Sequence, residues 1–291
     1  MHRYLLTAAL AAAPLAAAPA GPPASAGAAG AAAAPAPQEP FRWSGRVASG
    51  KTIEVKGVKG SIRAVPASGS EVEVVATRRS GGRSAAETVR VEVVPHEGGV
   101  TVCAVYPRGR REWNDDRGRM EERGGEGGYN RCDPGEWRNL NVQDNDVSVD
   151  FTVRVPAGVR LAARNVSGDV DAEGMRGYVD ARSVSGDVRI ATTGFGEAST
   201  VSGEIVAVLG SAGWSGDLDF RTVSGDITLE LPARTSTEVR VETMSGDIQS
   251  DFPLQVERRT MRRRARGTIG EGGRELYLTT LSGDVRLRRA P

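Results

Sequence analysis

The stretch SVSGDVRI, residues 183–190, decides the fold, because near-copies of it recur along the second half of the chain. The copies read NVSGDVDA, TVSGEIVA, TVSGDITL, TMSGDIQS and LSGDVRLR. The serine of each Ser-Gly-acid unit stands at position 167, 185, 202, 215, 224, 245 or 282. Taking Trp214–Asp217 as an extra corner within one unit, and allowing one long insertion before the last unit, the period is about 20 residues. Such a period is typical of solenoid coils.

Alternation within the repeat predicts a short strand after each corner. It places Val188 and Ile190 on one face, and Ile227 and Leu229 take the same positions in a later unit. Each coil would hold two or three short strands, and consecutive coils would pair in parallel at about 4.8 Å. We therefore predict an all-β fold, a parallel β-solenoid or β-helix-like stack of about 20-residue coils. A two-sheet β-sandwich is the alternative.

Variation among the repeats indicates that Ser-Gly-Asp is a structural corner. Two upstream segments, Trp43–Val47 and Val58–Ile62, occupy the same frame. The glycine never changes, and the residue two places later is always apolar. The aspartate, by contrast, is replaced by Glu204, Arg46 or Ser61. A corner needs glycine for positive φ, whereas a ligand site would need the carboxylate. We expect these turn glycines to be structural: Gly168, Gly186, Gly203, Gly216, Gly225, Gly246 and Gly283.

The functional alternative for the corners is a row of carboxylates that binds Ca²⁺. Known Ca²⁺-binding solenoids use a denser Gly- and Asp-rich nonapeptide than this one-acid corner. A side-chain hydrogen bond to a turn N–H would offset the repulsion between stacked carboxylates. We therefore predict no cofactor and no metal, with calcium as the alternative. The calcium ligands would be Asp169, Asp187, Asp226 and Asp247.

The first forty residues have the pattern of an export signal followed by a linker. A short basic start, an apolar stretch to about Ala18 and small-residue cleavage options predict a signal peptide over residues 1–26. Residues 27–40 form an Ala/Pro/Gly-rich linker. We expect the protein to be exported, to the periplasm, the cell surface or the medium, with no transmembrane anchor in the mature chain.

Residues 41–291 are expected to form a single β-solenoid domain. A polar, Gly-rich stretch over 107–131 predicts a disordered or loop insertion, and an Arg-rich loop is expected over 253–274. Cys103 and Cys132 flank the first of these. In an exported chain with two cysteines, a disulfide between them is the default.

Few residues of the kinds that carry catalysis are present. Lys plus Arg number 38 against 37 for Asp plus Glu, which argues against nucleic acid as a partner. Beyond the signal segment the chain keeps one histidine, His96, and it has no phosphate-loop or dinucleotide fingerprint. We predict a non-enzymatic protein without catalytic residues. A polysaccharide lyase or glycosidase on a β-helix is the alternative.

One charged segment is a candidate anion-binding element, because guanidinium groups bind phosphate and carboxylate bidentately. A solvated loop is the simpler interpretation. The arginines are Arg258, Arg259, Arg262, Arg263, Arg264 and Arg266.

The whole pattern resembles a known family. FRWSGRV and GKTIEVKGVKGSIRA near the start, DFTVRVPAGVRL in the middle, and TVSGDI units ending in LSGDVRLRR are similar to the bacterial putative-adhesin family, a domain of unknown function. It is related to the head domains of putative autotransporter adhesins. The resemblance covers nearly all of residues 41–289 and implies a solenoid-like all-β fold and export, without an established activity.

These observations predict an exported cell-envelope or surface protein that works as an adhesin-like binding module. Its partner would be an envelope glycan or anionic polymer, or another envelope protein. The alternative is an envelope-stress scaffold or sensor that contacts a membrane protein.

Overall fold

The computed structural model describes residues 39–107, 110–114, 119–123, 130–136, 145–259 and 262–290. The expected signal peptide, and the linker up to residue 38, lie outside this range. Residues Gln38–Pro291 form one compact unit. Among the described residues the only helix is the short 3₁₀ segment η1 (Ala86–Thr88).

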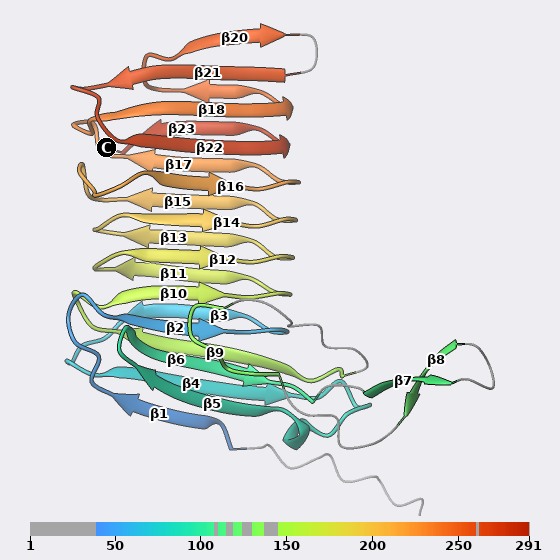
Figure 1. The fold of residues 1–291 in the computed structure, drawn as a ribbon. Coiled ribbons are helices and arrows are strands. Elements are labelled where there is room, and N and C mark those ends of the chain that lie inside the picture. The colour runs from blue at the N-terminus through green and yellow to red at the C-terminus, as the bar shows by residue number, and fades with distance from the viewer. Residues whose placement is uncertain are drawn as a thin grey trace, which may run out of the picture. The chain divides into compact units, whose positions relative to one another are not determined.

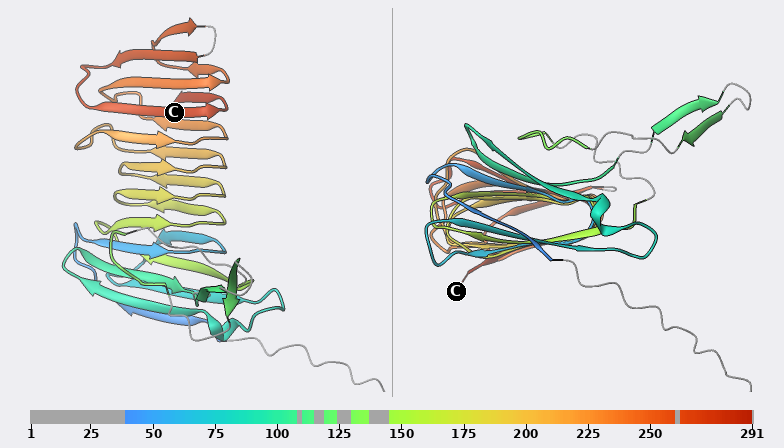
Figure 2. Two further views of the ribbon diagram at one scale, coloured as in Figure 1. Left: turned by 45° about the vertical axis from the view of Figure 1, so that its right-hand side comes forward. Right: turned by 90° about the horizontal axis from the view of Figure 1, so that it is seen from below.

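Two long sheets pack face to face in this unit (Figures 1 and 2). Sheet A holds, in spatial order, β1 (Phe41–Gly45), β4 (Val72–Arg79), β9 (Ser148–Val155), β3 (Ile62–Pro66), β11 (Val170–Met175), β13 (Val188–Thr192), β15 (Ile205–Leu209), β17 (Ile227–Leu231), β23 (Val285–Arg289) and β19 (Ile248–Ser250). Sheet B holds β20 (Gln255–Arg259), β21 (Arg262–Ile269), β18 (Thr237–Ser245), β22 (Glu275–Ser282), β16 (Leu218–Arg221), β14 (Gly196–Ser199), β12 (Val179–Arg182), β10 (Arg160–Arg164), β2 (Thr52–Lys56), β6 (Gly99–Val105) and β5 (Arg90–His96).

Each coil consists of a sheet B strand, a corner and a sheet A strand. The first apolar residues after successive corners pair in parallel, as Val188 does with Ile205, and Ile205 with Ile227. Their side chains are fully buried between the sheets, because alternate strand residues point to the same face. The all-β parallel stack predicted from the repeat is therefore confirmed.

The order of the coils departs from the order of the sequence near the C-terminus. The last coil, β22–β23, lies between coil β16–β17 and coil β18–β19, and it pairs in parallel with both. Our expectation that consecutive coils always pair was therefore wrong at this point. Coils with the same apolar pattern can exchange places in a stack, so that pattern alone does not set their order.

The prediction of an Arg-rich loop over 253–274 was also wrong, because this segment forms two strands. β20 pairs antiparallel with β21, and β21 pairs antiparallel with β18. Ala265 and Ile269 alternate inward on β21, and both are buried. Their spacing of four within a run of arginines is what the loop interpretation overlooked.

Of the two upstream segments that resemble the repeat, one forms a corner in the structure and the other does not. Lys59 bridges to Ser167 in parallel, so the corner at Gly60 stands in the same column as the others. The Ser44–Gly45 segment instead lies inside β1, which pairs antiparallel with β4, so its assignment to the same frame was wrong.

Within the expected insertion 107–131, residues 110–114 and 119–123 form the ribbon β7 (Arg110–Asn114) and β8 (Arg119–Arg123), and most others lie outside the described residues.

Candidate functional site

The Ser-Gly-acid corners stack into one column along an edge of the two sheets. Parallel bridges join Ser167, Ser185, Ser202, Ser224 and Ser282 in turn, and Ser245 pairs with Ser282. Gly186 has φ of 151°, and a Cβ added there would lie 2.3 Å from the carbonyl oxygen of Gly168. The glycines of this column therefore allow neighbouring backbones to approach closely.

The corner around Ser215 stands apart from that column. It lies in the connection from β15 to β16, at the opposite end of the strands. Gly216 has φ of 78°, and a Cβ added there would meet nothing within 4 Å. This corner therefore needs glycine for its backbone conformation alone.

A column of buried hydroxyls, which sequence reasoning missed, supports the corners. Thr200 Oγ1 donates to the carbonyl of Gly186 at 3.0 Å, and Thr222 Oγ1 donates to that of Gly203 at 3.2 Å. Ser183, Thr243 and Thr280 serve the neighbouring coils in the same way. The signal was a Ser, Thr or Asn three residues before the glycines at 168, 186, 203, 225, 246 and 283.

The corner carboxylates bind protein groups from the adjacent coils. Oδ1 of Asp169 accepts the N–H of Asp187 at 2.9 Å, and Oδ1 of Asp187 accepts the N–H of Glu204 at 2.9 Å. Asp226 likewise accepts the N–H of Asp284 at 2.8 Å. Each carboxylate thus satisfies a turn amide that has no ladder partner, which gives the acid a structural role.

Arginines neutralise several of these carboxylates. Arg286 lies 2.8 Å from Asp226 and 2.7 Å from Asp284. Its hydrogen bond to Asp226, followed by the N–H of Asp284, holds the pKa of that aspartate below its ordinary value. The described residues contain no group of three or more His, Cys, Asp or Glu side chains placed to hold a metal ion. Asp169, Asp187, Asp226 and Asp247 form one row whose members bind turn amides and arginines.

The outer face of sheet B carries a ladder of ion pairs. Glu54 accepts from Arg164 at 3.1 Å, and Arg164 reaches Asp180 at 2.9 Å. Arg182 continues the ladder with a contact of 2.8 Å to Asp180. Burial, followed by the charge of Asp180, raises the pKa of Glu197 on the next strand. This face is therefore mixed in charge and mostly self-compensated.

A disulfide fixes the segment that covers one end of this ladder. Cys103 and Cys132 are bonded, with an S–S distance of 2.02 Å. The covering segment accepts two hydrogen bonds from Lys56 Nζ, at 2.5 Å by the carbonyl of Asp133 and at 2.6 Å by that of Glu136. The bridge thus holds a lid over a buried charge pair, since Lys56 lies 3.5 Å from Glu54.

His96 lies in the β5–β6 hairpin, within reach of a hydroxyl. Its Nδ1 accepts the N–H of Gly98 at 3.1 Å, so in the neutral ring Nε2 carries the proton and faces Thr101 Oγ1 at 3.2 Å. Thr101 is buried and donates its own proton to Glu54 at 2.9 Å. A base that activates a nucleophile must instead accept the hydroxyl proton, so this arrangement is unsuited to nucleophilic catalysis.

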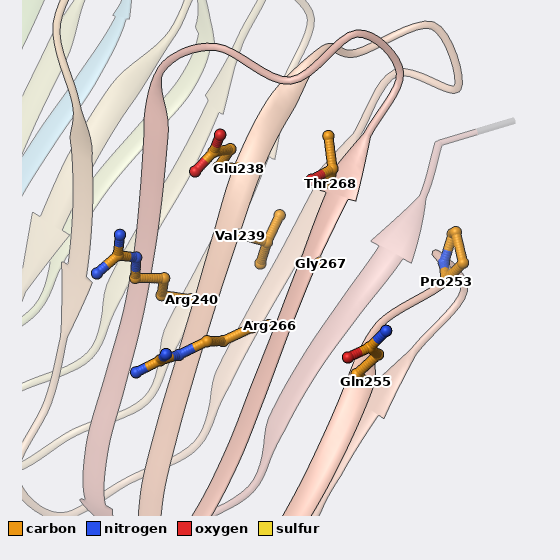
Figure 3. A pocket seen from close by; sticks show the side chains of 8 residues that line it. All are labelled: Glu238, Val239, Arg240, Pro253, Gln255, Arg266, Gly267 and Thr268. Carbon is orange, nitrogen blue, oxygen red and sulfur yellow. The ribbon is translucent and has the colours of Figure 1, made fainter.

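A groove lies on the outer face of sheet B, at the end formed by β18, β21 and the segment leading into β20 (Figure 3). Its volume is about 500 Å³. The register places Arg240 beside Arg266, and Arg266 beside Gln255. We call it the β18–β21 groove; its lining residues are Glu238, Val239, Arg240, Pro253, Gln255, Arg266, Gly267 and Thr268.

The two arginines of the groove differ in their surroundings. Arg240 is held by an ion pair with Glu275 and lies over the ring of Tyr277, 5.9 Å from its centroid. Arg266 is exposed, and it pairs with no acidic side chain of the part of the chain that the structure describes. Because Glu238 and Thr268 lie beside these cations, the groove offers acceptors and donors together.

The structure divides the Arg-rich candidates. Arg264 lies 2.9 Å from Glu242, and Arg262 lies 3.8 Å from the same carboxylate. Arg263 reaches back to the Gly246 carbonyl and to Asp247. Arg258 and Arg259 lie on β20, paired with Arg263 and Arg262, and their side chains fall outside the described set. Of these six arginines, Arg266 is among the described residues that line the groove, together with Arg240, which sequence reasoning did not select. Anion binding by the six stays a prediction.

Comparisons with known proteins agree with the repeat pattern. Residues 49–288 match the family described as Toastrack DUF4097. This confirms the family resemblance drawn from the TVSGDI units. No curated protein matches the chain.

Two solved structures are similar over most of the chain. A putative cell adhesion protein from Clostridium sporogenes is 8% identical, with a TM-score of 0.43, covering 87% of this chain and 100% of its own. A putative adhesin from Bacteroides fragilis is 11% identical, with a TM-score of 0.28, covering 87% of this chain and 99% of its own. In the described part of the protein, no helix has the length and apolar character needed to cross a membrane.

Proposed function

The chain belongs to the Toastrack DUF4097 family, and on that premise we propose that it is an exported, non-enzymatic binding module of the cell envelope or surface. The Cys103–Cys132 disulfide supports export, because disulfides persist in oxidising compartments. The described strands supply a rigid platform, and binding would take place on its outer face.

The proposed binding site is the β18–β21 groove, and the observation that carries it is the exposed guanidinium of Arg266, which pairs with no acidic side chain among the described residues. A guanidinium offers a planar fork of donors that matches a carboxylate or phosphate. Arg240, held in place by Glu275, lies on the neighbouring strand. An acidic group of the ligand, bound between Arg240 and Arg266, would supply the carboxylate or phosphate that Arg266 lacks among the described residues.

The groove also suits a hydroxyl-rich chain. Glu238 accepts hydrogen bonds, while Thr268 and Gln255 both donate and accept them. Sugar hydroxyls fit such a lining, and one acidic substituent per few sugars would engage Arg266. We therefore propose an anionic envelope glycan as the ligand class.

Binding of polygalacturonate, a uronic acid polymer, tests this proposal by titration calorimetry. Replacing the guanidinium in Arg266→Gln should weaken binding about tenfold, since a hydrogen bond to a charged group contributes about 1.5–3 kcal/mol. The matched control is Arg63→Gln, an exposed arginine paired with Glu173 on the outer face of sheet A, which should bind as the parent does. Equal affinities for the parent and Arg266→Gln would refute the groove as the site.

A further inference from the structure

The two ends of the coil stack are closed differently. At the N-terminal end, both sheets continue past coil β2–β3: sheet A adds β9, β4 and β1, and sheet B adds β6 and β5. At the other end, sheet B continues past coil β18–β19 with β21 and β20, but no described strand follows β19 in sheet A. Sheet B therefore extends two strands beyond sheet A, which leaves a step at this end of the stack (Figure 1).

The recessed side of the step ends in an open strand edge. β19 pairs with β23 along one edge, and its other edge pairs with no strand of the described chain. Arg263 occupies the corner before β19, and the buried Phe252 fills the space after it. The backbone of residues 248–250 between them is left open, and such an edge is a template for another strand.

The projecting side of the step carries an apolar side chain on its core face. Val256 of β20 stands opposite Ala265, and Ala265 stands opposite Val241. Ala265 and Val241 are buried at 1% exposure, whereas Val256 is 46% exposed. It faces the core side of sheet B, at a level where sheet A has no strand to cover it.

We propose that a second copy of this chain docks at this end, and that each copy adds its β20 to the open edge of the β19 of its partner. A two-fold axis along the strand direction exchanges sheet A with sheet B. The two-strand projection of one copy then fills the two-strand recess of the other, and both sheets run on without a gap. Val256 of each copy becomes covered.

Strand direction agrees with this arrangement. β20 is antiparallel to β21, and β21 is antiparallel to β18, so β20 runs with β18. Within a coil the chain reverses, so β19 runs against β18 (Figure 1). A two-fold axis along the strands preserves these directions, so β20 of one copy meets β19 of the other as an antiparallel pair, the more stable kind.

The charges at the two strand ends are compatible with the same pairing. Asp247 and Asp251 flank β19, and β20 ends with two arginines, at positions 258 and 259. Antiparallel alignment brings the arginine end of β20 toward the Asp247 end of β19.

Because both open edges are used once the two copies meet, the assembly closes as a dimer and does not grow into a fibre.

Sedimentation of the full chain over a range of concentrations tests the dimer. Val256→Lys should weaken association at least tenfold, because a charge would lie between the joined cores. The matched control is Val223→Lys, which changes a valine of similar exposure (43%) in the corner column and should associate as the parent does. A parent that sediments as a monomer at every concentration would overturn the proposal.

Cysteine crosslinking tests the strand pairing itself. A mixture of Gln249→Cys and Glu257→Cys chains should form crosslinked heterodimers, since both positions point outward on strands proposed to pair. Thr228→Cys, on the outer face of β17, replaces Gln249→Cys in the control mixture, which should give at least tenfold less product. Equal yields in the two mixtures would overturn the pairing, whatever the oligomeric state.

Discussion

Each corner in the Ser-Gly-acid column depends on a single glycine, because the next coil passes directly against it. A Cβ at Gly203 would stand 2.1 Å from the carbonyl oxygen of Gly186, and one at Gly225 would stand 2.0 Å from that of Gly203. The repeat keeps glycine at this position and tolerates change at the acid. Close backbone approach, in addition to positive φ, is the reason.

Substituting alanine at two corner glycines should separate these two causes. Gly186→Ala combines positive φ with a backbone clash and should lower the free energy of unfolding by about 2–4 kcal/mol. Gly216→Ala has positive φ in open space and should cost about 1 kcal/mol. Urea unfolding of both variants measures the difference, and equal losses would mean that the coils can move apart at the column.

Sequence reasoning found the glycines but not the hydroxyls that accompany them. Nothing in the sequence singled out Thr200 and Thr222, since threonine is common in strands. Their buried hydroxyls donate to the corner glycines of neighbouring coils, a contact between residues 14 and 19 positions apart. Such a partner becomes visible only when the coil order is known.

Among the structural elements, the outward row of sheet B places carboxylates on adjacent strands. Asp180 pairs with Glu197 across β12 and β14, with Arg182 4.0 Å from Glu197. Burial and the charge of Asp180 raise the pKa of Glu197. Its ionised form is therefore less favourable in the folded protein than in the unfolded chain.

The stability of Glu197→Gln should depend on pH accordingly. Above the raised pKa of Glu197, at pH 7, the variant should be more stable than the parent by about 1 kcal/mol or less, because it removes an ionised group that burial disfavours. The gain should disappear below the ordinary carboxyl pKa, where Glu197 is protonated in both states. Thermal unfolding at pH 7 and pH 3.5, with Glu71→Gln as the exposed control, measures this. A variant less stable than the parent at pH 7 would contradict the assignment.

Coil β18–β19 stands at the end of the stack, and a side chain replaces the contacts that a further coil would make with its corner. In the preceding coil the Gly283 carbonyl accepts from Thr243, and Asp284 accepts the N–H of Asp247. Gly246 and Asp247 have no further coil beside them, and Arg263 donates to both. Arg263 therefore caps the column, a role different from the ligand binding predicted for it.

Removing this cap should loosen one end of the stack. Arg263→Ala should lower the free energy of unfolding by about 1–2 kcal/mol and should speed amide exchange over residues 246–250. Arg264→Ala, which breaks an exposed ion pair with Glu242, should cost less than about 1 kcal/mol and leave that exchange unchanged. Equal exchange in the two variants would contradict the capping role.

For the whole molecule, the repeat period predicted the solenoid class, and the alternation predicted which residues face its core. The position of coil β22–β23 between two earlier coils could not be predicted, because all coils present equivalent edges. The β18–β21 groove could not be predicted either, since it joins β18 to β21, and β21 lies within the segment 253–274 that was expected to be a loop. Arg266 was selected for its charge, while Arg240 was found only through the register of β18 and β21.

The Ser-Gly-acid column is a ladder of amide, hydroxyl and carboxylate contacts, and we predict that it binds no metal. Thermal unfolding of the full chain and of Asp187→Asn, in EDTA and in millimolar Ca²⁺, tests it most directly. We expect one midpoint for the parent in both solutions, and the same loss for Asp187→Asn in both, since Arg189 loses its ion pair either way. A clear rise of the parent midpoint with Ca²⁺ that Asp187→Asn abolishes would contradict it, because a ligand of the native state stabilises by mass action.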